Sequence, residues 1–289
     1  MGIGIAFNKK IDIELAGEGV APISIICPDS GRKPSIEING TYDASDVIND
    51  FTVRITNFYI SGLSSYTRIR VSAGYMNGRT LCAEGDISFS YTESPGPDRV
   101  TVLCCKIGDA TAWTNRFINI SFSNPVTIQD LIQKISDSLG FGTPNIDADL
   151  RSQTLPYFFH TGRASGALHY LTELLPKVNI TTANNRISVW TPAKGDDRSA
   201  QANSRSFLIQ NLTTPPAITG NTANVVAPWT PDIRPGDYVT FPTRFFSQDY
   251  AAAQAGTGGE TCRIQVQTMN FRFATTEDAN EMQLEGIIC

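Results

Sequence analysis

The chain has 289 residues, of which 41% are hydrophobic and 18% are charged, and its formal net charge is −5. A chain of this length can bury a large core, and a mildly acidic chain lacks the broad positive field of nucleic-acid-binding proteins. The six cysteines include no Cys-x-x-Cys pair and there are only two histidines, which argues against zinc and dithiol redox sites. We expect buried, reduced thiols in a protein made in a reducing cytosol.

Alternating apolar residues predict strands throughout the first 122 residues. Phe51, Val53 and Ile55 alternate with polar neighbours, and turn signals such as Asn77-Gly78 and the run at 95–98 separate the strands. The same period of two occurs at residues 3–7, 11–15, 69–75, 81–91 and 118–122. We therefore predict an antiparallel β-barrel or sandwich domain over residues 1–122.

The spacing of apolar residues then changes to three and four, which predicts a helix. Thr127 can cap it, Asp130 favours the positive helix end, and Gly140 suits the left-handed residue that ends it. The apolar stripe of this helix comprises Ile128, Leu131, Ile132, Ile135 and Leu139.

A second helix is predicted from Ser165, as its cap, to Leu175, before Pro176. Asn184-Asn185 then joins two short apolar runs, 178–182 and 187–190, which predicts a hairpin. Two helices and a hairpin make residues 123–193 a compact α+β insert.

Strand patterns return after the polar linker at 194–205 and continue to the last residues. Pro235 and Gly236 lie in a turn before the strand at 238–241, with Gly236 where the φ angle can be positive. The predicted fold is therefore mainly β, with a second antiparallel β-domain over residues 194–289.

The search for catalytic and metal-binding residues finds no convincing constellation. His160 and His169 belong to no triad order, and His169 lies beside the apolar stripe of the second helix, where a core-edge histidine is expected. Asp147 and Asp149 lack the spacing of an EF-hand loop. Glu84, Asp86 and Glu93, the candidates for glycoside cleavage, lie on a predicted strand and are expected to face solvent. We predict no catalytic residue, cofactor or metal.

No membrane insertion is expected, because no apolar run reaches the ~20 residues of a membrane span and the first residues do not form a leader.

Two sets of side chains are candidates for contacts with other molecules. Arg54, Arg68 and Arg70 are expected on the outward faces of neighbouring strands, either for solubility and edge protection or at a subunit seam or channel lining. Aromatic residues in or beside loops would mark an interface if they are exposed; they are Trp113, Trp229, Phe245 and Phe246.

Several segments resemble the baseplate hub proteins of tailed bacteriophages and contractile injection systems. DFTVRITNFYISGLSSYTRIRVSAGYMNGRTLCAEGDISFSY is similar to the family's first barrel, and VTIQDLIQKISDSLGF, SGALHYLTELL and ISVW are similar to its inserted domain. PDIRPGDYVTF resembles the P-x-x-x-P-G-D-x-V segment of its second barrel. The resemblance covers roughly residues 45–289.

The resemblance implies two similar barrels per chain that flank the insert. Three copies would form a ring of six quasi-equivalent barrels between the tail tube and the central spike, with contacts to other baseplate proteins. The ring would enclose a channel through which DNA passes without specific binding. The resemblance places the protein in the virion, at the distal tail, after assembly in the host cytoplasm.

Other functions are kept as alternatives. A tail-tube or distal-tail ring protein would have a similar pattern, with six copies in place of three. A tail-associated cell-wall hydrolase would need an acid/base pair that the sequence does not offer. A carbohydrate-binding β-module would use Trp113, Trp229 and Tyr250 as sugar platforms.

Overall fold

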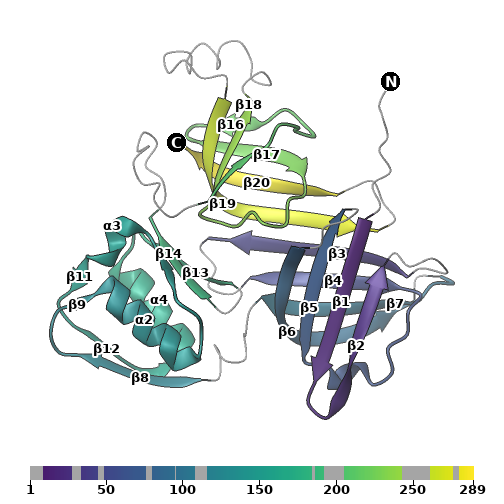
Figure 1. Ribbon diagram of the computed structural model, residues 1–289, viewed down its shortest axis with the longest axis horizontal. Coiled ribbons are helices and arrows are strands. Elements are labelled where there is room, and N and C mark those ends of the chain that lie inside the picture. Colours follow the sequence, from purple (N-terminus) through teal and green to yellow (C-terminus); the bar gives the residue numbers. More distant parts are fainter. Residues whose placement is uncertain are drawn as a thin grey trace.

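The computed structural model describes residues 9–27, 34–44, 49–75, 80–94, 96–107, 116–183, 186–191, 205–242, 261–275 and 280–289. The protein is mainly β, with one large sheet and a smaller α+β insert that lies beside it (Figure 1). The predicted strand at 3–7 and the predicted turns at Asn77-Gly78 and Asn184-Asn185 fall outside the described residues.

Thirteen strands from both ends of the chain form the large sheet. Those before the insert are β1 (Lys9–Gly17), β2 (Val20–Cys27), β3 (Ser35–Asp43), β4 (Asp50–Thr56), β5 (Arg68–Tyr75), β6 (Thr80–Glu93) and β7 (Val100–Ile107), with a short 3-10 helix η1 (Leu63–Ser65). Those after it are β15 (Ser206–Leu208), β16 (Ala217–Thr219), β17 (Thr222–Pro228), β18 (Tyr238–Pro242), β19 (Thr261–Ala274) and β20 (Glu281–Ile288).

The two strand-rich regions join at β3 and β19. The main strand order is β16-β17-β20-β19-β3-β4-β7-β6-β5-β1-β2, with β18 pairing β19 and β15 pairing β18. Thr41 of β3 faces Asn270 of β19, and its hydroxyl donates to the Asn270 side chain over 2.7 Å. The described strands follow an open path, so closure into two barrels, and the division into three domains, stay predictions.

Most strands of the large sheet send alternate side chains into one core, as the period of two predicts. Phe51, Val53 and Ile55 of β4 are buried, while Thr52 and Arg54 lie on the opposite face. The core combines side chains from Ile11 to Ile107 with others from Ile209 to Ile288. Burying one such aliphatic or phenyl side chain contributes about 1.5–3 kcal/mol, so the two regions stabilise each other.

The insert has its own core. Its elements are β8 (Phe117–Phe122), β9 (Val126–Thr127), α2 (Ile128–Leu139), β10 (Asn145–Ile146), α3 (Ala148–Arg151), β11 (Thr154–Leu155), β12 (Phe158–Arg163), α4 (Ala164–Leu174), β13 (Asn179–Ala183) and β14 (Arg186–Trp190). β8 pairs with β12, and β13 with β14, both antiparallel. The first predicted helix is α2, and all five residues of its stripe are buried.

The ends of α2 agree with the prediction, and the start of α4 does not. The Thr127 hydroxyl accepts a hydrogen bond from the backbone N–H of Asp130 over 3.0 Å, and Gly140 has a φ angle of 74°. The predicted cap at Ser165 is wrong: α4 begins at Ala164, with Arg163 at the N-cap position and no side-chain cap. The physical reason is that β12 runs directly into the helix.

Candidate functional site

The face of the large sheet that points away from the core carries cross-strand ion pairs. Arg68 lies 3.9 Å from Asp86 and Arg70 lies 4.0 Å from Glu84, each between β5 and β6. Further pairs on this face are Arg54–Glu93 at 2.6 Å, Lys106–Asp50 at 3.6 Å and Arg272–Glu37 at 2.7 Å. Strand register brings these opposite charges together, so this polar face is ordered along with the sheet. We call it the outer sheet face.

The outer sheet face is acidic over β1 to β7. The strand register places eight acidic side chains on it, which are Asp12, Glu14, Glu37, Asp43, Asp50, Glu84, Asp86 and Glu93. It places five basic side chains there, which are Lys10, Arg54, Arg68, Arg70 and Lys106. The acidic excess means that the basic side chains do not sum to a positive field.

The three predicted arginines therefore lie on one face, and each is paired with a carboxylate. Trp229 does not satisfy the condition of exposure, because it is 3% exposed and its ring stacks on Phe271 at 5.7 Å within the core. Trp113, Phe245, Phe246 and Tyr250 lie outside the described residues.

An apolar island on the same face was not among the predicted contact residues. Phe89 and Tyr91 of β6 are 60% and 42% exposed, and their rings stack at 6.0 Å. The alternation of this strand places both rings on one face. Tyr91 pairs with Val102, and Val102 pairs with Arg54. These two pairings assign both rings to the outer sheet face and not to the core face. The pairing of Val102 with Arg54 is a long-range contact.

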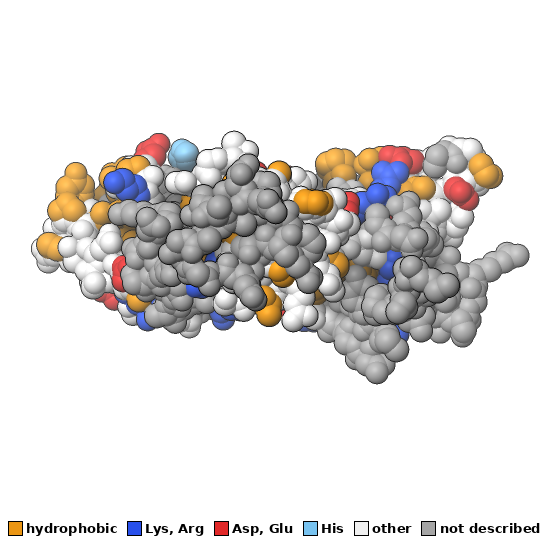
Figure 2. All heavy atoms as spheres, turned by 90° about the horizontal axis from the view of Figure 1, so that it is seen from above, with side chains coloured by type: hydrophobic (Ala, Val, Ile, Leu, Met, Phe, Trp, Pro, Cys, Tyr) orange, Lys and Arg blue, Asp and Glu red, His pale blue; other side chains and the backbone are white. Residues whose placement is uncertain are grey.

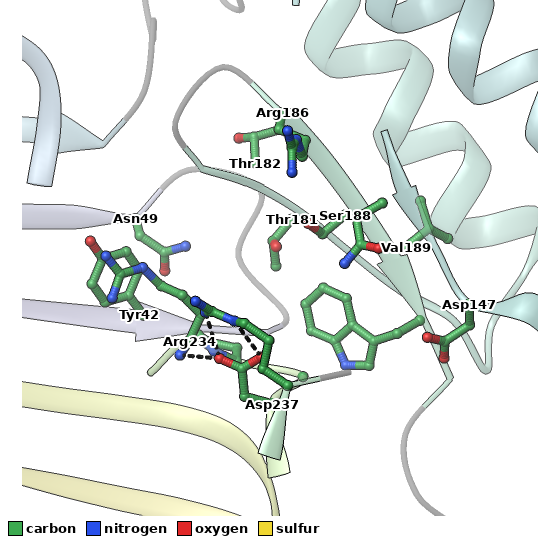
Figure 3. Close-up of a pocket in the computed structure, with 15 residues that line it drawn as sticks. Tyr42, Asn49, Asp147, Thr181, Thr182, Arg186, Ser188, Val189, Arg234 and Asp237 are labelled. Atoms are coloured by element: carbon green, nitrogen blue, oxygen red, sulfur yellow. Dashed lines mark hydrogen bonds and ion pairs between the residues drawn. The ribbon is translucent and has the colours of Figure 1, made fainter. Parts of the chain in front are cut away.

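A cavity of about 560 Å³ lies at the junction between the insert and the large sheet (Figure 3). Asp147, Thr181 and Ser188 line it from the insert, and Tyr42 and Asp237 line it from the sheet side. The lining is mostly polar, so the insert meets the sheet through hydrogen-bonding groups. The two hydrophobic cores stay separate at this point.

The turn Pro231–Tyr238 is central to this junction. Asp237 accepts hydrogen bonds from the Arg234 backbone N–H at 2.8 Å and from the Arg205 guanidinium at 2.8 Å (Figure 3). Arg234 in turn donates to the Cys82 carbonyl over 2.9 Å and stacks over the Tyr42 ring. One segment of the turn therefore contacts strands that precede it in the sequence by more than 150 residues.

Gly236 packs closely against Trp190 of the insert. Its φ angle is 89°, and a β-carbon at this position would lie 3.1 Å from the Trp190 indole. A left-handed conformation without a β-carbon is what glycine supplies. The prediction of a positive φ angle at Gly236 is confirmed.

Two carboxyl groups at the junction are held in partly desolvated surroundings. Burial raises the pKa of Asp237, although the Arg205 guanidinium and the Arg234 N–H oppose the rise. Burial also raises the pKa of Asp147, against the Thr191 N–H that donates to it over 3.1 Å. Both carboxylates accept hydrogen bonds from backbone N–H groups, so they stabilise the structure of the junction.

Two buried cysteines are not activated as nucleophiles. Burial raises the pKa of the Cys82 thiol to about 12 and that of Cys262 to about 11, so both remain protonated at neutral pH. His169 is exposed on α4 and lies 3.6 Å from Glu173, so its expected place at the core edge is wrong. The helix turns it to solvent next to buried Leu168.

Across the described ranges, no group of three or more His, Cys, Asp and Glu side chains could hold a metal ion. The described helices include none that is long and apolar enough to cross a membrane.

Comparison with known proteins finds similar structures. No family model matches the sequence, and no curated protein matches it. A tail protein from Neisseria meningitidis MC58 has a TM-score of 0.55 at 10% identity, with 97% of this chain and 96% of that chain covered. The 43 kDa tail protein of prophage MuSo2 from Shewanella oneidensis has a TM-score of 0.57 at 10% identity, with 96% and 98% covered.

A third similar structure comes from a secretion system. The E. coli c3393 protein, a component of the type VI secretion system with structural similarity to the T4 bacteriophage tail proteins gp27 and gp5, has a TM-score of 0.53 at 10% identity. The alignment covers 90% of this chain and 76% of that one. The chain therefore has the fold of these tail proteins, and the resemblance to the baseplate hub family is confirmed at the level of the fold.

Proposed function

We propose that the chain is a structural baseplate hub protein of a phage tail, without enzymatic activity. The observation that carries the proposal is the outer sheet face, which runs across β1–β7 and, through the pairing of β3 with β19, onto the strands after the insert. The fold shared with tail proteins over 96–97% of the chain supports it. A hub protein needs one long, ordered surface that can line a channel, and the outer sheet face supports the proposal because it is long and ordered.

Three copies form a pseudo-sixfold ring in this proposal, with two barrels per chain. The large sheet ends at β2 on one side and at β16 on the other, and each has a neighbour on one side only among the described strands. Exposed edges invite pairing with another chain. The 54% exposure of Ile26 in β2 fits a strand that a neighbouring copy covers.

The outer sheet face lines the DNA channel in the assembled ring. Its acidic excess over β1–β7 would repel phosphates, so DNA would pass without the counterion-releasing contacts that hold it to basic proteins. The tail tube above and the spike below are the proposed partners, with other baseplate proteins around them. The place of action is the distal tail of a virion that is assembled in the host cytoplasm.

The copy number tests the proposal. We expect the purified 31.5 kDa chain to form a ring of three copies by light scattering, and electron microscopy to show six barrel densities around a hole. Ile26→Lys at the β2 edge should lower the trimer fraction at least tenfold. Phe89→Lys is the matched control: it adds the same charge to an exposed apolar residue of the outer sheet face away from the edge, and should leave the trimer intact.

A ring of six copies would support the alternative, a tail-tube or distal-tail ring protein. A monomer at high concentration, or equal loss of assembly in both variants, would contradict the hub. Cell-wall lysis by the purified chain in a zymogram would contradict the non-enzymatic role.

A further inference from the structure

The strands β8 and β12 form a two-stranded sheet on the outside of the insert. Their inner face is covered by the insert core. Ile118, Ile120 and Phe158 are buried there against α2 and α4. Each strand has a partner on one side only among the described strands. Within the described residues, the outer edges of β8 and β12 therefore have no strand partner, and an added strand can pair at such an edge.

The outer face of this β8–β12 sheet carries aromatic rings. Phe117 is 75% exposed, and Tyr157 and Phe159 are each 63% exposed. The register places Phe117 opposite Arg163 and Phe159 opposite Ser121, so the two phenyl rings are four residues apart along the sheet, about 13 Å. Figure 2 shows hydrophobic side chains gathered at the left-hand end of the molecule, which is the end formed by the insert.

The polar side chains between the rings are already ordered. The Thr161 hydroxyl donates to the Asn119 side chain over 3.0 Å, across the strands. The outer face thus alternates apolar, polar and apolar positions at the spacing that a neighbouring extended chain presents.

The charge on this sheet is opposite to that of the chain as a whole. Residues 116–123 and 157–163 contain two arginines and no aspartate or glutamate, in a chain of net charge −5. Arg116 is engaged, because it donates to the Leu139 carbonyl at the end of α2 over 2.9 Å. Arg163 is exposed next to Phe117, and no ion pair of Arg163 occurs within the described part of the chain. The charged group at this end of the sheet therefore suits an acidic partner.

Protein fits this face better than carbohydrate does. Sugar platforms use Trp and Tyr, which add a polar group to the ring, whereas two of the three exposed rings here, Phe117 and Phe159, are phenyl rings that offer apolar area alone. Exposed phenyl rings beside free strand edges are features of strand addition and of protein interfaces.

We propose that the β8–β12 sheet is a docking site for an acidic, extended segment of another tail protein, which adds as a third strand. On the edge of β12, the segment presents a carboxylate to Arg163 and, four residues away, an apolar side chain to Phe159. This inference rests on the proposed function, since the partner is a component of the same tail. It assigns the insert to the attachment of a peripheral protein, away from the ring.

Photo-crosslinking in assembled particles tests the proposal. Phe159 is replaced by p-benzoylphenylalanine, tail particles are purified from the producing host, and the crosslinked peptide is sequenced by mass spectrometry. We expect a crosslink to a segment of a different tail protein with a carboxylate within a few residues. Adding Arg163→Glu should lower the yield at least fivefold, while Arg163→Lys, the matched control, should retain most of it.

Hydrogen exchange supplies the second measurement. Amides on the outer edge of β8 or β12 should exchange at least tenfold more slowly in the particle than in the free chain, while those of α2 change little. Particles that lack the chain would overturn the proposed function. Particles that contain it, but give no crosslink at Phe159, or a crosslink to glycan, to a basic segment or to a second copy of this chain, would overturn this inference alone.

Discussion

The large sheet and the insert are held together in different ways. The large sheet joins strands from the two ends of the chain around one core, whereas the insert, which is continuous in sequence, keeps a core of its own. Between them lies a polar cavity in which Arg234 and Asp237 form charged hydrogen bonds. The two ends of the chain, which are far apart in the sequence, therefore share a core, whereas the insert between them does not share it. The chain leaves the sheet once, folds a unit of its own, and returns to complete the sheet (Figure 1).

The largest expected effect comes from breaking the shared core at the seam. The Phe271 ring of β19 stacks on Tyr42 of β3 at 5.6 Å and on Trp229 at 5.7 Å. We expect Phe271→Ala to lower the free energy of unfolding by about 3–5 kcal/mol, because it leaves a cavity between the two regions. Hydrogen exchange should become faster in β3 and β20 together, while α2 is unaffected.

The matched control removes a buried side chain from the other core. Leu131 is fully buried in α2, so Leu131→Ala should cost about 2–5 kcal/mol. Its effect should be confined to exchange in the insert. If either substitution accelerated exchange in both units equally, the two cores would be one cooperative unit and the contrast between them would fail.

The parts of the fold that were predicted correctly have local causes. The cap at Thr127, the buried stripe and the left-handed Gly140 all lie within one segment of fourteen residues, so the sequence contains the whole helix. Gly236 is a similar case, since its turn is encoded by adjacent residues. The outward positions of Arg54, Arg68 and Arg70 follow from the period of two alone.

The parts that were missed depend on contacts between distant segments. The pairing of Thr41 with Asn270 spans 229 residues, and no local pattern shows that the two strand-rich regions share a sheet. The strand β12, which contains Gly162, was not predicted from the sequence, because the pairing with β8 that orders it is a contact across the sheet. The cavity was missed for the same reason, because Asp147 and Asp237 come to line one cavity only when distant segments pack together.

An intermediate effect is expected at the junction between the two units. In Gly236→Ala, the methyl group would meet the Trp190 indole and the residue would be strained at a φ angle of 89°. A left-handed non-glycine residue costs roughly 1–2 kcal/mol, and the contact adds to that cost. We expect faster hydrogen exchange at β14 and at the Pro231–Tyr238 turn, with both cores unchanged. Gly220→Ala is the control, because its φ angle is also positive and its β-carbon would meet nothing within 4 Å.

The smallest expected effect is a dependence on pH at the seam. Burial would raise the pKa of Glu37, but hydrogen bonds from Asn39 and from Arg272, at 2.7 Å, lower it below its ordinary value. A carboxyl with a lowered pKa in the folded state stabilises the protein above its unfolded-state pKa, and this contribution disappears as pH falls through the folded-state pKa. Glu37→Gln should therefore lower the free energy of unfolding at pH 7 by less than about 1 kcal/mol, since the pair is partly exposed.

Below the folded-state pKa of Glu37 the parent and Glu37→Gln should have nearly equal stability, which urea unfolding at several pH values measures.

The junction should respond in the opposite direction. Burial raises the pKa of Asp237 in the folded state, so its contribution favours folding at low pH and weakens as pH rises between the unfolded and folded values. Asp237→Asn removes this titrating group. The dependence of the unfolding free energy on pH should therefore change in this variant with the sign opposite to that in Glu37→Gln. If both variants changed the pH dependence of the unfolding free energy with the same sign, folding would shift the pKa of Glu37 and the pKa of Asp237 in the same direction. That result would contradict the difference between the surroundings of the two carboxyl groups.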